Sequence, residues 1–264
     1  MEQGTRAEAR RIAIEVQYDG TPYNGWQIQN GGRTVQGEIE RAIEVLTKEK
    51  SRTIASGRTD SGVHSLGQIA HFDTHSPITL QRFCIGLNGI LPKDIAVINA
   101  YGVSGDFHAR FDAVQRTYRY LIHNHPSRSP FMMYRAMWVH ESLDIDYLNT
   151  VLGLLIGEKD FSSFCKKRES KNITTVRRIS GAVARKHGDL ISIEITGNAF
   201  LHNMIRIIVG TVVDMNKRKA DPSLLTDIIA RQDRDCSGVT APPYGLYLVK
   251  VLYEPDLSSS ESAF

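Results

Sequence analysis

Apolar residues recur at two spacings along this chain, at alternate positions as in a strand and every three or four residues as in a helix. The elements that these spacings predict follow the same order twice. Residues 11–18 alternate apolar and polar, as a half-buried strand does. Thr34 stands after a Gly- and Asn-rich loop where a helix N-cap is expected, and apolar residues recur behind it at helical spacing. Strands at 52–56, 67–74 and 95–103 and a helix at 79–90 complete the first half. Its predicted order is β-α-β-β-α-β.

The second half is expected to repeat this order with insertions. The pattern predicts strands at 116–123, 176–184, 190–196 and 246–253, and helices at 143–156, 201–213 and 222–230. Residue identity between the halves is weak, so the repeat is one of elements only. We predict an α+β fold of two split β-α-β-β-α-β (ferredoxin-like) halves, residues 1–110 and 111–264, with the helices on one face of each sheet.

The composition is that of an ordinary globular protein, with 41% hydrophobic and 23% charged residues. The longest apolar runs are too short to span a bilayer, and the N-terminal residues lack the apolar core of a signal peptide. We therefore expect a cytoplasmic protein without a membrane partner.

Positive charge is concentrated in one part of the chain, although the net charge is only +3. Residues 166–219 hold 12 Lys and Arg against 4 Asp and Glu. A localised basic surface attracts a phosphate backbone, although the same side chains could be solvated charges on loops and helix ends. The pattern favours a nucleic acid as partner, and Lys166, Lys167 and Arg168 are candidate RNA contacts.

Cysteine and histidine spacing predicts neither a disulfide nor a metal site. The three cysteines lie far apart, and no H-E-x-x-H motif occurs among the nine histidines. His71 and His75 stand four residues apart, but in a segment expected to form a strand and its end. We expect no metal, and we interpret His64 and His202 as structural or RNA-contacting.

The densest group of chemically capable side chains lies in residues 56–64, where Arg58 and Asp60 stand between Gly57 and Gly62. Glycines allow such a turn to present side chains outward. A neighbouring guanidinium typically lowers the pKa of a carboxyl by about 1–3 units, which keeps it ionised. An ionised carboxylate can act as nucleophile or base. The alternative is an ordinary turn with a surface ion pair.

Two further side chains stand out in the second half. The strand period places Tyr118 and Tyr120 on one face, where a tyrosine could be a stacking platform or part of the core. Arg206 interrupts an apolar helix, and a buried guanidinium needs an anionic partner unless it extends to the surface. Leu246 begins the last apolar strand, where ordinary core packing is the alternative to a binding role.

The segment from Gly57 to Phe72 resembles the signature of the tRNA pseudouridine synthase A family, roughly G-R-T-D-A-G-V-H-x-x-G-Q-x-x-H-F. Every fixed position matches except Ser61, where the family usually has alanine. Residues 18–36, 116–120, 200–210 and 241–248 resemble further family segments, in the same order and over nearly the whole chain.

The resemblance implies an isomerase that converts uridine to pseudouridine without a cofactor or metal. The N1–C1′ bond is broken, the base turns, and C5 is joined to C1′. The implied substrate is the anticodon stem-loop of tRNA, at positions 38, 39 and 40, and the implied assembly is a homodimer. The resemblance also implies that the two sheets are joined and that an active-site cleft lies between the halves.

Site roles are implied for the residues that match. Asp60 would be the nucleophile, and attack on C6, attack on C1′ and removal of a sugar proton all stay open. Tyr118 would stack on the displaced base, and Leu246 would lie under it. Arg206 would pair with Asp60. Arg58 would help displace the base or hold a phosphate.

Two other function classes compete with this hypothesis. A catalytically silent RNA-binding module could share the fold, although the set of Arg58, Asp60, Tyr118 and Arg206 favours an enzyme. A metal-dependent hydrolase could use the histidines together with Asp60, and stoichiometric metal in the purified protein would favour it.

Overall fold

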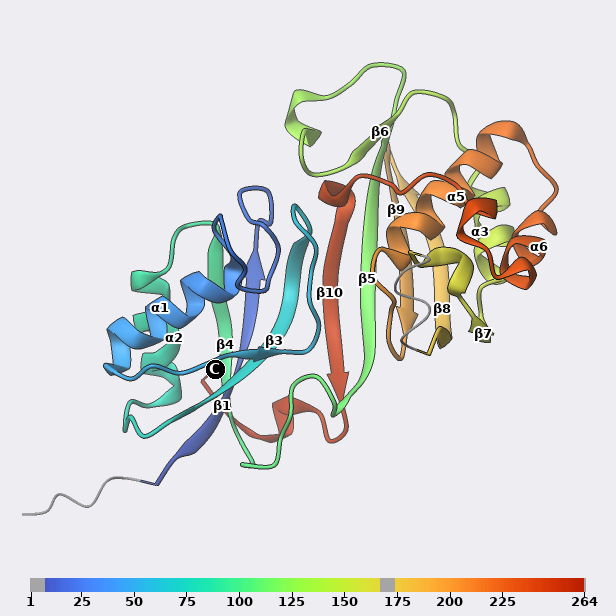
Figure 1. Cartoon of the computed structure of the whole chain (residues 1–264). Coiled ribbons are helices and arrows are strands. Elements are labelled where there is room, and N and C mark those ends of the chain that lie inside the picture. The colour runs from blue at the N-terminus through green and yellow to red at the C-terminus, as the bar shows by residue number, and fades with distance from the viewer. Residues whose placement is uncertain (1–7, 167–173, 264) are drawn as a thin grey trace, which may run out of the picture. The chain divides into compact units, whose positions relative to one another are not determined.

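The computed structural model describes residues 8–166 and 174–263 (Figure 1). Lys167 and Arg168, two of the predicted RNA contacts, lie outside the described residues. The chain divides into two compact units, unit 1 with Met1–Val114 and Leu248–Phe264, and unit 2 with Gln115–Tyr247. In the described ranges, no helix is long and apolar enough to cross a lipid bilayer.

Unit 1 is a sheet with two helices. Its elements are β1 (Arg10–Tyr18), α1 (Val35–Thr47), β2 (Ile54–Ala55), β3 (His64–Thr74), α2 (Leu80–Ile90), β4 (Ile95–Val103), most of β10 (Leu246–Tyr253) and β11 (Glu261–Ser262). The strand order is β11-β4-β1-β3-β10, and β2 pairs with β3. Strand β1 runs antiparallel to both β3 and β4.

The two helices of unit 1 begin where capping threonines precede apolar stripes. The Thr34 side chain accepts a hydrogen bond from the Gly37 N–H, and the Thr79 side chain accepts one from the Arg82 N–H. Both helices lie on the same face of the sheet (Figure 1). Their buried stripes meet the inward side chains of the strands in one core, which includes Ile14 and Phe72.

Unit 2 follows the order β-α-β-β-α with insertions, and the strand that closes the order, β10, lies mostly in unit 1. Its elements are β5 (Ala113–Asn124), β6 (Met137–Val139), α3 (Ile145–Gly153), β7 (Gly157–Asp160), β8 (Val176–His187), β9 (Leu190–Gly197), α5 (Met204–Arg218) and α6 (Leu224–Arg231). The strand order is β5-β9-β8-β7, and β6 pairs with β5 in parallel. Helix α3 is tied to the sheet by Asn149, whose amide exchanges two hydrogen bonds with the backbone of Ala184.

The predicted α+β class and the β-α-β-β-α-β order of elements are confirmed. The division of the chain differs, because residues 248–264 pack in unit 1 rather than with the second half. Strand β10 lies beside β3, and β11 pairs with β4. Such pairings join segments far apart in sequence, so a local pattern does not reveal them. The joined sheets and the cleft concern the two units together and stay predictions.

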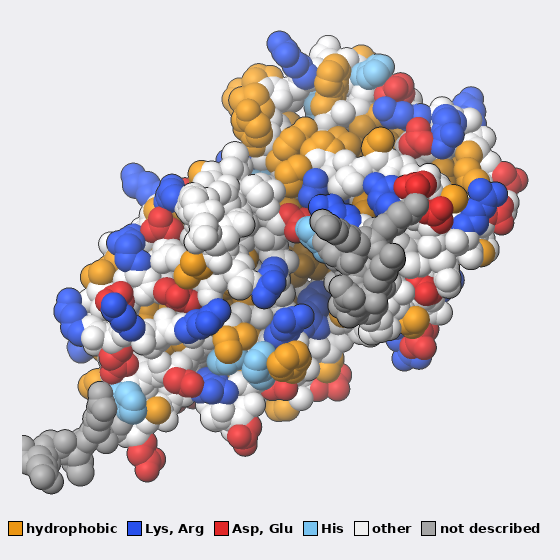
Figure 2. All heavy atoms as spheres, in the orientation of Figure 1, with side chains coloured by type: hydrophobic (Ala, Val, Ile, Leu, Met, Phe, Trp, Pro, Cys, Tyr) orange, Lys and Arg blue, Asp and Glu red, His pale blue; other side chains and the backbone are white. Residues whose placement is uncertain are grey.

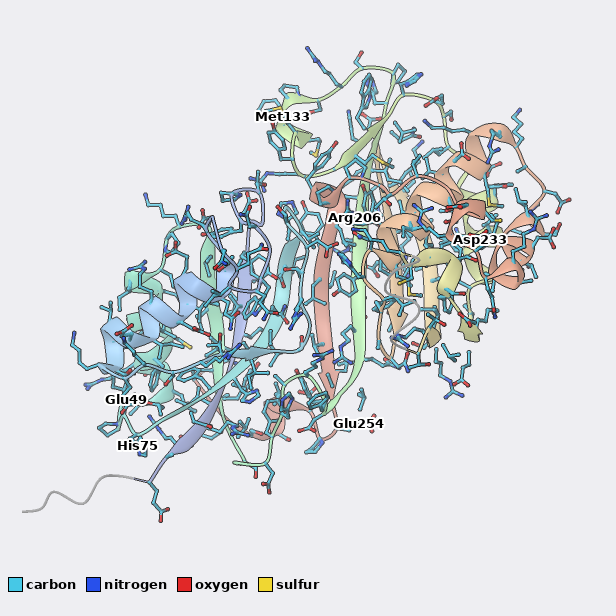
Figure 3. All side chains as sticks on the ribbon, viewed as in Figure 1. Glu49, His75, Met133, Arg206, Asp233 and Glu254 are labelled. Atoms are coloured by element: carbon cyan, nitrogen blue, oxygen red, sulfur yellow. The ribbon has the colours of Figure 1, made fainter. Side chains whose placement is uncertain are left out.

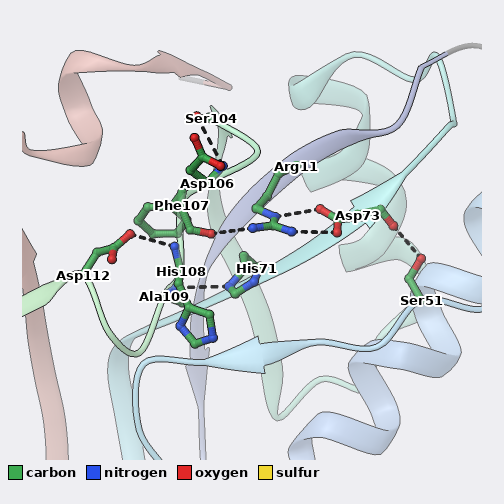
Figure 4. Close-up of polar contacts among 10 residues, drawn as sticks. All are labelled: Arg11, Ser51, His71, Asp73, Ser104, Asp106, Phe107, His108, Ala109 and Asp112. Atoms are coloured by element: carbon green, nitrogen blue, oxygen red, sulfur yellow. Dashed lines mark hydrogen bonds and ion pairs between the residues drawn. The ribbon is translucent and has the colours of Figure 1, made fainter.

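A side-chain network holds the segment 104–112 against the sheet of unit 1 (Figure 4). The Arg11 guanidinium donates from Nε and Nη2 to the two carboxylate oxygens of Asp73, at 2.7 and 2.8 Å. Its Nη1 donates to the carbonyl oxygen of Phe107 at 2.8 Å. Arg11 of β1 therefore connects β3 to the segment 104–112 through hydrogen bonds to both.

His71 supplies a second attachment for the same segment (Figure 4). Its Nδ1 accepts a hydrogen bond from the Ala109 N–H at 3.1 Å, and the Tyr253 hydroxyl donates to the Ala109 carbonyl at 2.7 Å. Burial, together with the positive charge of Arg11, lowers the pKa of His71 to about 4. The imidazole is therefore neutral at neutral pH.

We expect this histidine to make the free energy of unfolding fall in mild acid. The unfolded chain takes up a proton at His71 near its ordinary pKa of about 6.5, whereas the folded chain does so only near pH 4. Stability is therefore complete above the unfolded value and is lost as the pH falls through this window, by about 2 kcal/mol between pH 7.5 and 5. Urea unfolding of wild type and His71→Asn measures this. The variant keeps a side-chain acceptor and cannot be protonated, so its fall should be smaller; an equal fall in both would contradict the assignment.

Candidate active site

The Asp60 loop, residues 57–63, is built against a neighbouring loop, residues 19–26. The Trp26 N–H donates to the Thr59 carbonyl at 3.1 Å. The Tyr23 carbonyl accepts from the Gly62 N–H at 3.3 Å and from the Ser61 hydroxyl at 3.1 Å. The Asp60 carbonyl accepts from the Val63 N–H at 3.1 Å and closes the turn. The backbone on both sides of Asp60 is thus held in place.

Two glycines allow the loops to approach this closely. A Cβ added at Gly20 would lie 2.0 Å from the Val63 carbonyl oxygen, and one added at Gly25 would lie 2.5 Å from the Thr59 carbonyl oxygen. Gly25 also has a φ of +85°, in the left-handed region that favours glycine. Both positions therefore require the absence of a side chain.

Gln68 fixes the beginning of the Asp60 loop from β3. Its Oε1 accepts from the Ser56 hydroxyl at 2.6 Å, and its Nε2 donates to the Gly57 carbonyl at 2.8 Å. The Gln68 side chain is fully buried, where hydrogen-bonding groups need such partners. Gln68 is a fixed position of the signature, and these two hydrogen bonds give it a structural role in holding the loop.

The loop presents two of the predicted catalytic side chains, and the residue that follows it, His64, is buried. Arg58 is exposed and Asp60 is half-buried, whereas Thr59, which lies between them, and Val63 are buried. His64 is 1% exposed, and its Nδ1 accepts from the Gly20 N–H at 3.1 Å. This burial supports a structural role for His64 rather than the RNA contact.

In unit 2 the two tyrosines of β5 have different surroundings. Tyr120 is fully buried, its hydroxyl donates to the Pro242 carbonyl at 2.8 Å, and burial raises its pKa. Tyr118 is half-buried and meets the ring of Phe200 edge-on, with centroids 5.3 Å apart. Tyr120 is therefore a core residue, and Tyr118 is the one of the pair with partly exposed surface.

Arg206 lies in the first turn of α5 (Figure 3). Its Nε donates to the Ala241 carbonyl at 2.8 Å, and its Nη1 donates to Asn203 Oδ1 at 2.7 Å. The Ala241 N–H in turn donates to the Arg206 carbonyl at 3.0 Å. Asn203 stands at the N-cap position in a left-handed conformation, with a φ of +61°, and its side chain makes no capping hydrogen bond. These contacts orient the guanidinium at the helix start, and its pairing with Asp60 stays a prediction.

Leu246 follows the same segment along the chain. It is 6% exposed and comes directly after the 3-10 turn Pro243–Gly245. A Cβ at Gly245 would lie 2.6 Å from the Tyr120 ring, so the turn rests on that ring. Unit 2 thus brings together the middle of β5, the start of α5 and residues 241–246.

Lys166 and His202 are both exposed, and their predicted contact with RNA stays a prediction. Among the residues that the structure describes, no group of three or more His, Cys, Asp or Glu side chains could hold a metal ion.

A family model described as tRNA pseudouridine synthase matches residues 14–112 and 152–254, which include the Asp60 loop, its supporting loop and the start of α5. The chain belongs to the tRNA pseudouridine synthase family. Pseudouridine synthases are isomerases, so family membership also gives the class of enzyme. A curated relative from Caldicellulosiruptor bescii named tRNA pseudouridine synthase A is 45% identical over 92% of this chain and 100% of its own length. One of the same name from Paraburkholderia xenovorans is 41% identical over 92% of this chain and 90% of its own length.

Several residues that build the family's loop were not predicted to have a role. Tyr18 and Gly25 lie in a segment that resembles the family. The glycines of that segment were the sequence signal that its backbone approaches another part of the chain closely. Gln68 stands in the signature itself, but its two bonds depend on the fold. Asn203 was not predicted as a cap, because the apolar pattern placed the start of the helix at Leu201; asparagine is nevertheless a residue that favours the N-cap and tolerates the left-handed conformation.

The close approach at Gly20 predicts a large effect of one methyl group. Gly20→Ala should lower the free energy of unfolding by about 1–3 kcal/mol, because the new Cβ overlaps the Val63 carbonyl. Gly57→Ala is the matched control in the Asp60 loop, since a Cβ there meets nothing within 4 Å, and it should change stability by less than about 0.5 kcal/mol. Urea unfolding of both variants tests this, and equal effects would show that the loops can separate freely.

Proposed function

We propose that this chain isomerises uridine to pseudouridine in the anticodon stem-loop of tRNA, at positions 38, 39 and 40, with Asp60 as the nucleophile. The observation that carries the proposal is the construction of the Asp60 loop. Its backbone is fixed on both sides of Asp60, and it presents a half-buried Asp60 with the exposed Arg58 two residues before it in the chain. The name of these relatives, tRNA pseudouridine synthase A, supports tRNA as the substrate.

The reaction needs no external reactant. The N1–C1′ bond breaks, the C5–C1′ bond forms, C5 gives up its hydrogen to water and N1 takes up a proton. The target base must first leave its stack, which costs a few kcal/mol. We assign Asp60, Arg58 and Arg206 to catalysis. Tyr118, whose ring is partly exposed, would stack on the displaced base, and Leu246 would bind it through apolar contact.

Release of tritium from tRNA that carries 5-tritiated uridine measures this reaction directly. Wild type in EDTA should release the label, and Asp60→Asn should be slower by a thousandfold or more, on the order seen when a nucleophile is removed. The control variant is Asp106→Asn, because Asp106 is an exposed carboxylate of unit 1 just beyond β4, the strand that ends at Val103. It should retain the wild-type rate.

Each other outcome points to a different function. Release by Asp60→Asn at the wild-type rate would remove the nucleophile assignment. A folded wild type that binds tRNA without releasing label would be an RNA-binding module. Activity that EDTA abolishes would favour a metal-dependent enzyme.

We also propose that the chain forms a homodimer through the apolar surface of residues 131–138. Phe131 is 85% exposed, Met133 61%, Tyr134 51% and Trp138 46%. Figure 2 shows hydrophobic side chains gathered on the part of unit 2 where Figure 3 labels Met133. Aromatic and methionine side chains are enriched in interfaces, and exposed apolar groups of this kind mark interaction sites.

The fold holds this surface in a fixed arrangement. Tyr134 has a φ of +58° and meets the Tyr244 ring edge-on at 6.0 Å. The neighbouring Arg135 carbonyl accepts from the Tyr247 hydroxyl at 2.8 Å, and Trp138 Nε1 donates to the His125 carbonyl at 2.8 Å. Because these side chains are already held in place, less conformational entropy is lost when a partner binds, which supports a binding role.

Sedimentation of wild type and a double variant tests the homodimer. Wild type should sediment at twice the chain mass at micromolar concentration, and Phe131→Ser with Met133→Ser should weaken dimerisation by at least tenfold, since two anchors of the apolar surface are lost. Ile85→Ser is the control, because Ile85 is 63% exposed on α2 of unit 1. A monomeric wild type, or a double variant that dimerises as well as wild type, would contradict the proposal.

A further inference from the structure

A buried pair of hydroxyl groups lies directly before the proposed nucleophile. The Tyr18 hydroxyl and the Thr59 Oγ1 are 2.8 Å apart, and the two residues are 4% and 6% exposed. Tyr18 is the last residue of β1, and Thr59 precedes Asp60 in the chain. The bond therefore connects a strand end to the residue next to the reacting carboxylate.

We propose that Tyr18 and Thr59 are positioning residues that fix where Asp60 lies relative to the sheet of unit 1. This inference rests on the proposed function of Asp60. It adds two side chains that act on the reaction through Asp60 rather than by touching the substrate.

The pair adds an attachment at the residue next to Asp60, which the other contacts do not supply. The bonds from Trp26 and Tyr23 join the Asp60 loop to the 19–26 loop, and Gln68 of β3 holds the beginning of the Asp60 loop at Ser56 and Gly57. Tyr18 reaches Thr59 from a strand that is paired on both sides, with Ser65 of β3 and Ile95 of β4 opposite it. Groups held on strands are placed more accurately than groups held on loops.

The surroundings of Thr59 give this bond a defined geometry. Its hydroxyl bonds to Tyr18, and its carbonyl accepts from the Trp26 N–H at 3.1 Å. The rings of Tyr18 and Trp26 in turn pack against each other, with centroids 6.1 Å apart. The three residues form a closed triangle, so the orientation of the peptide that leads into Asp60 is set from two directions.

The reaction is sensitive to this placement. Catalysis depends on a near-attack geometry, and a misplacement of about 1 Å can cost a hundredfold in rate. Binding of tRNA draws on a much larger surface and should depend little on the position of one carboxylate. Loss of the hydroxyl pair should therefore slow the chemical step and leave the affinity for tRNA nearly unchanged.

The test combines Tyr18→Phe, Thr59→Val and the double variant, each of which removes a hydroxyl with little change of shape. Single-turnover tritium release should fall about 10- to 100-fold in each single variant, with tRNA affinity within about threefold of wild type. Because both substitutions break the same bond, the double variant should be no slower than the slower single variant. Thr59→Ser keeps a hydroxyl and should recover most of the rate.

Thr74→Val separates this role from a loss of stability. Thr74 is 1% exposed at the opposite end of β3, and its hydroxyl donates to Glu49 at 2.6 Å. The variant loses the hydrogen bond of a buried threonine hydroxyl at the other end of the strand from Asp60, so it should lower the free energy of unfolding and leave the single-turnover rate unchanged.

Three results would overturn the inference: full rates in both single variants, losses that appear only in tRNA affinity, or losses that multiply in the double variant. If Thr59→Val does not fold, Tyr18→Phe decides alone by the same two measurements. Failure of the proposed function has a different signature, because wild type itself would then release no tritium.

Discussion

The close contact between residues 19–26 and 57–63 is the constraint on which the candidate site depends. Neither loop contains regular secondary structure, yet backbone bonds and two glycines hold them together at distances that exclude a side chain. A carboxylate on a free turn would sample many positions, and ordering it would cost conformational entropy during the reaction. In this protein the loop is ordered when the chain folds, so the backbone at Asp60 is already fixed before a substrate binds.

The signature segment serves the fold as much as the chemistry. Asp60 and Arg58 are the members that the loop presents, whereas Gln68 holds the loop's beginning. Gly67 allows β3 to approach the Val249 carbonyl of β10, where an added Cβ would lie 2.6 Å away. His71 anchors a distant segment. A sequence match over this stretch therefore reports a whole supporting structure rather than a set of reactive groups.

Local features of the fold could be predicted from the sequence, and long-range ones could not. Thr34 and Thr79 were recognisable as helix starts because a cap and an apolar stripe are both local signals. The short β11 and the place of β10 in unit 1 depend on partners more than a hundred residues away. The same limit applies to the site: Asp60 was found from neighbouring residues, but the bond from Tyr18 to Thr59 exists only once β1 and the loop have met.

The return of residues 248–264 to unit 1 has a consequence for synthesis of the chain. The ribosome completes the first 114 residues of the unit long before it reaches the strand and tail that finish the same sheet. At about 5–20 residues per second, the interval is roughly 8–30 s. During that time β3 lacks its neighbour β10, and β4 lacks β11. The nascent N-terminal segment therefore leaves the ribosome with open sheet edges, and unpaired edges are templates for pairing with other chains.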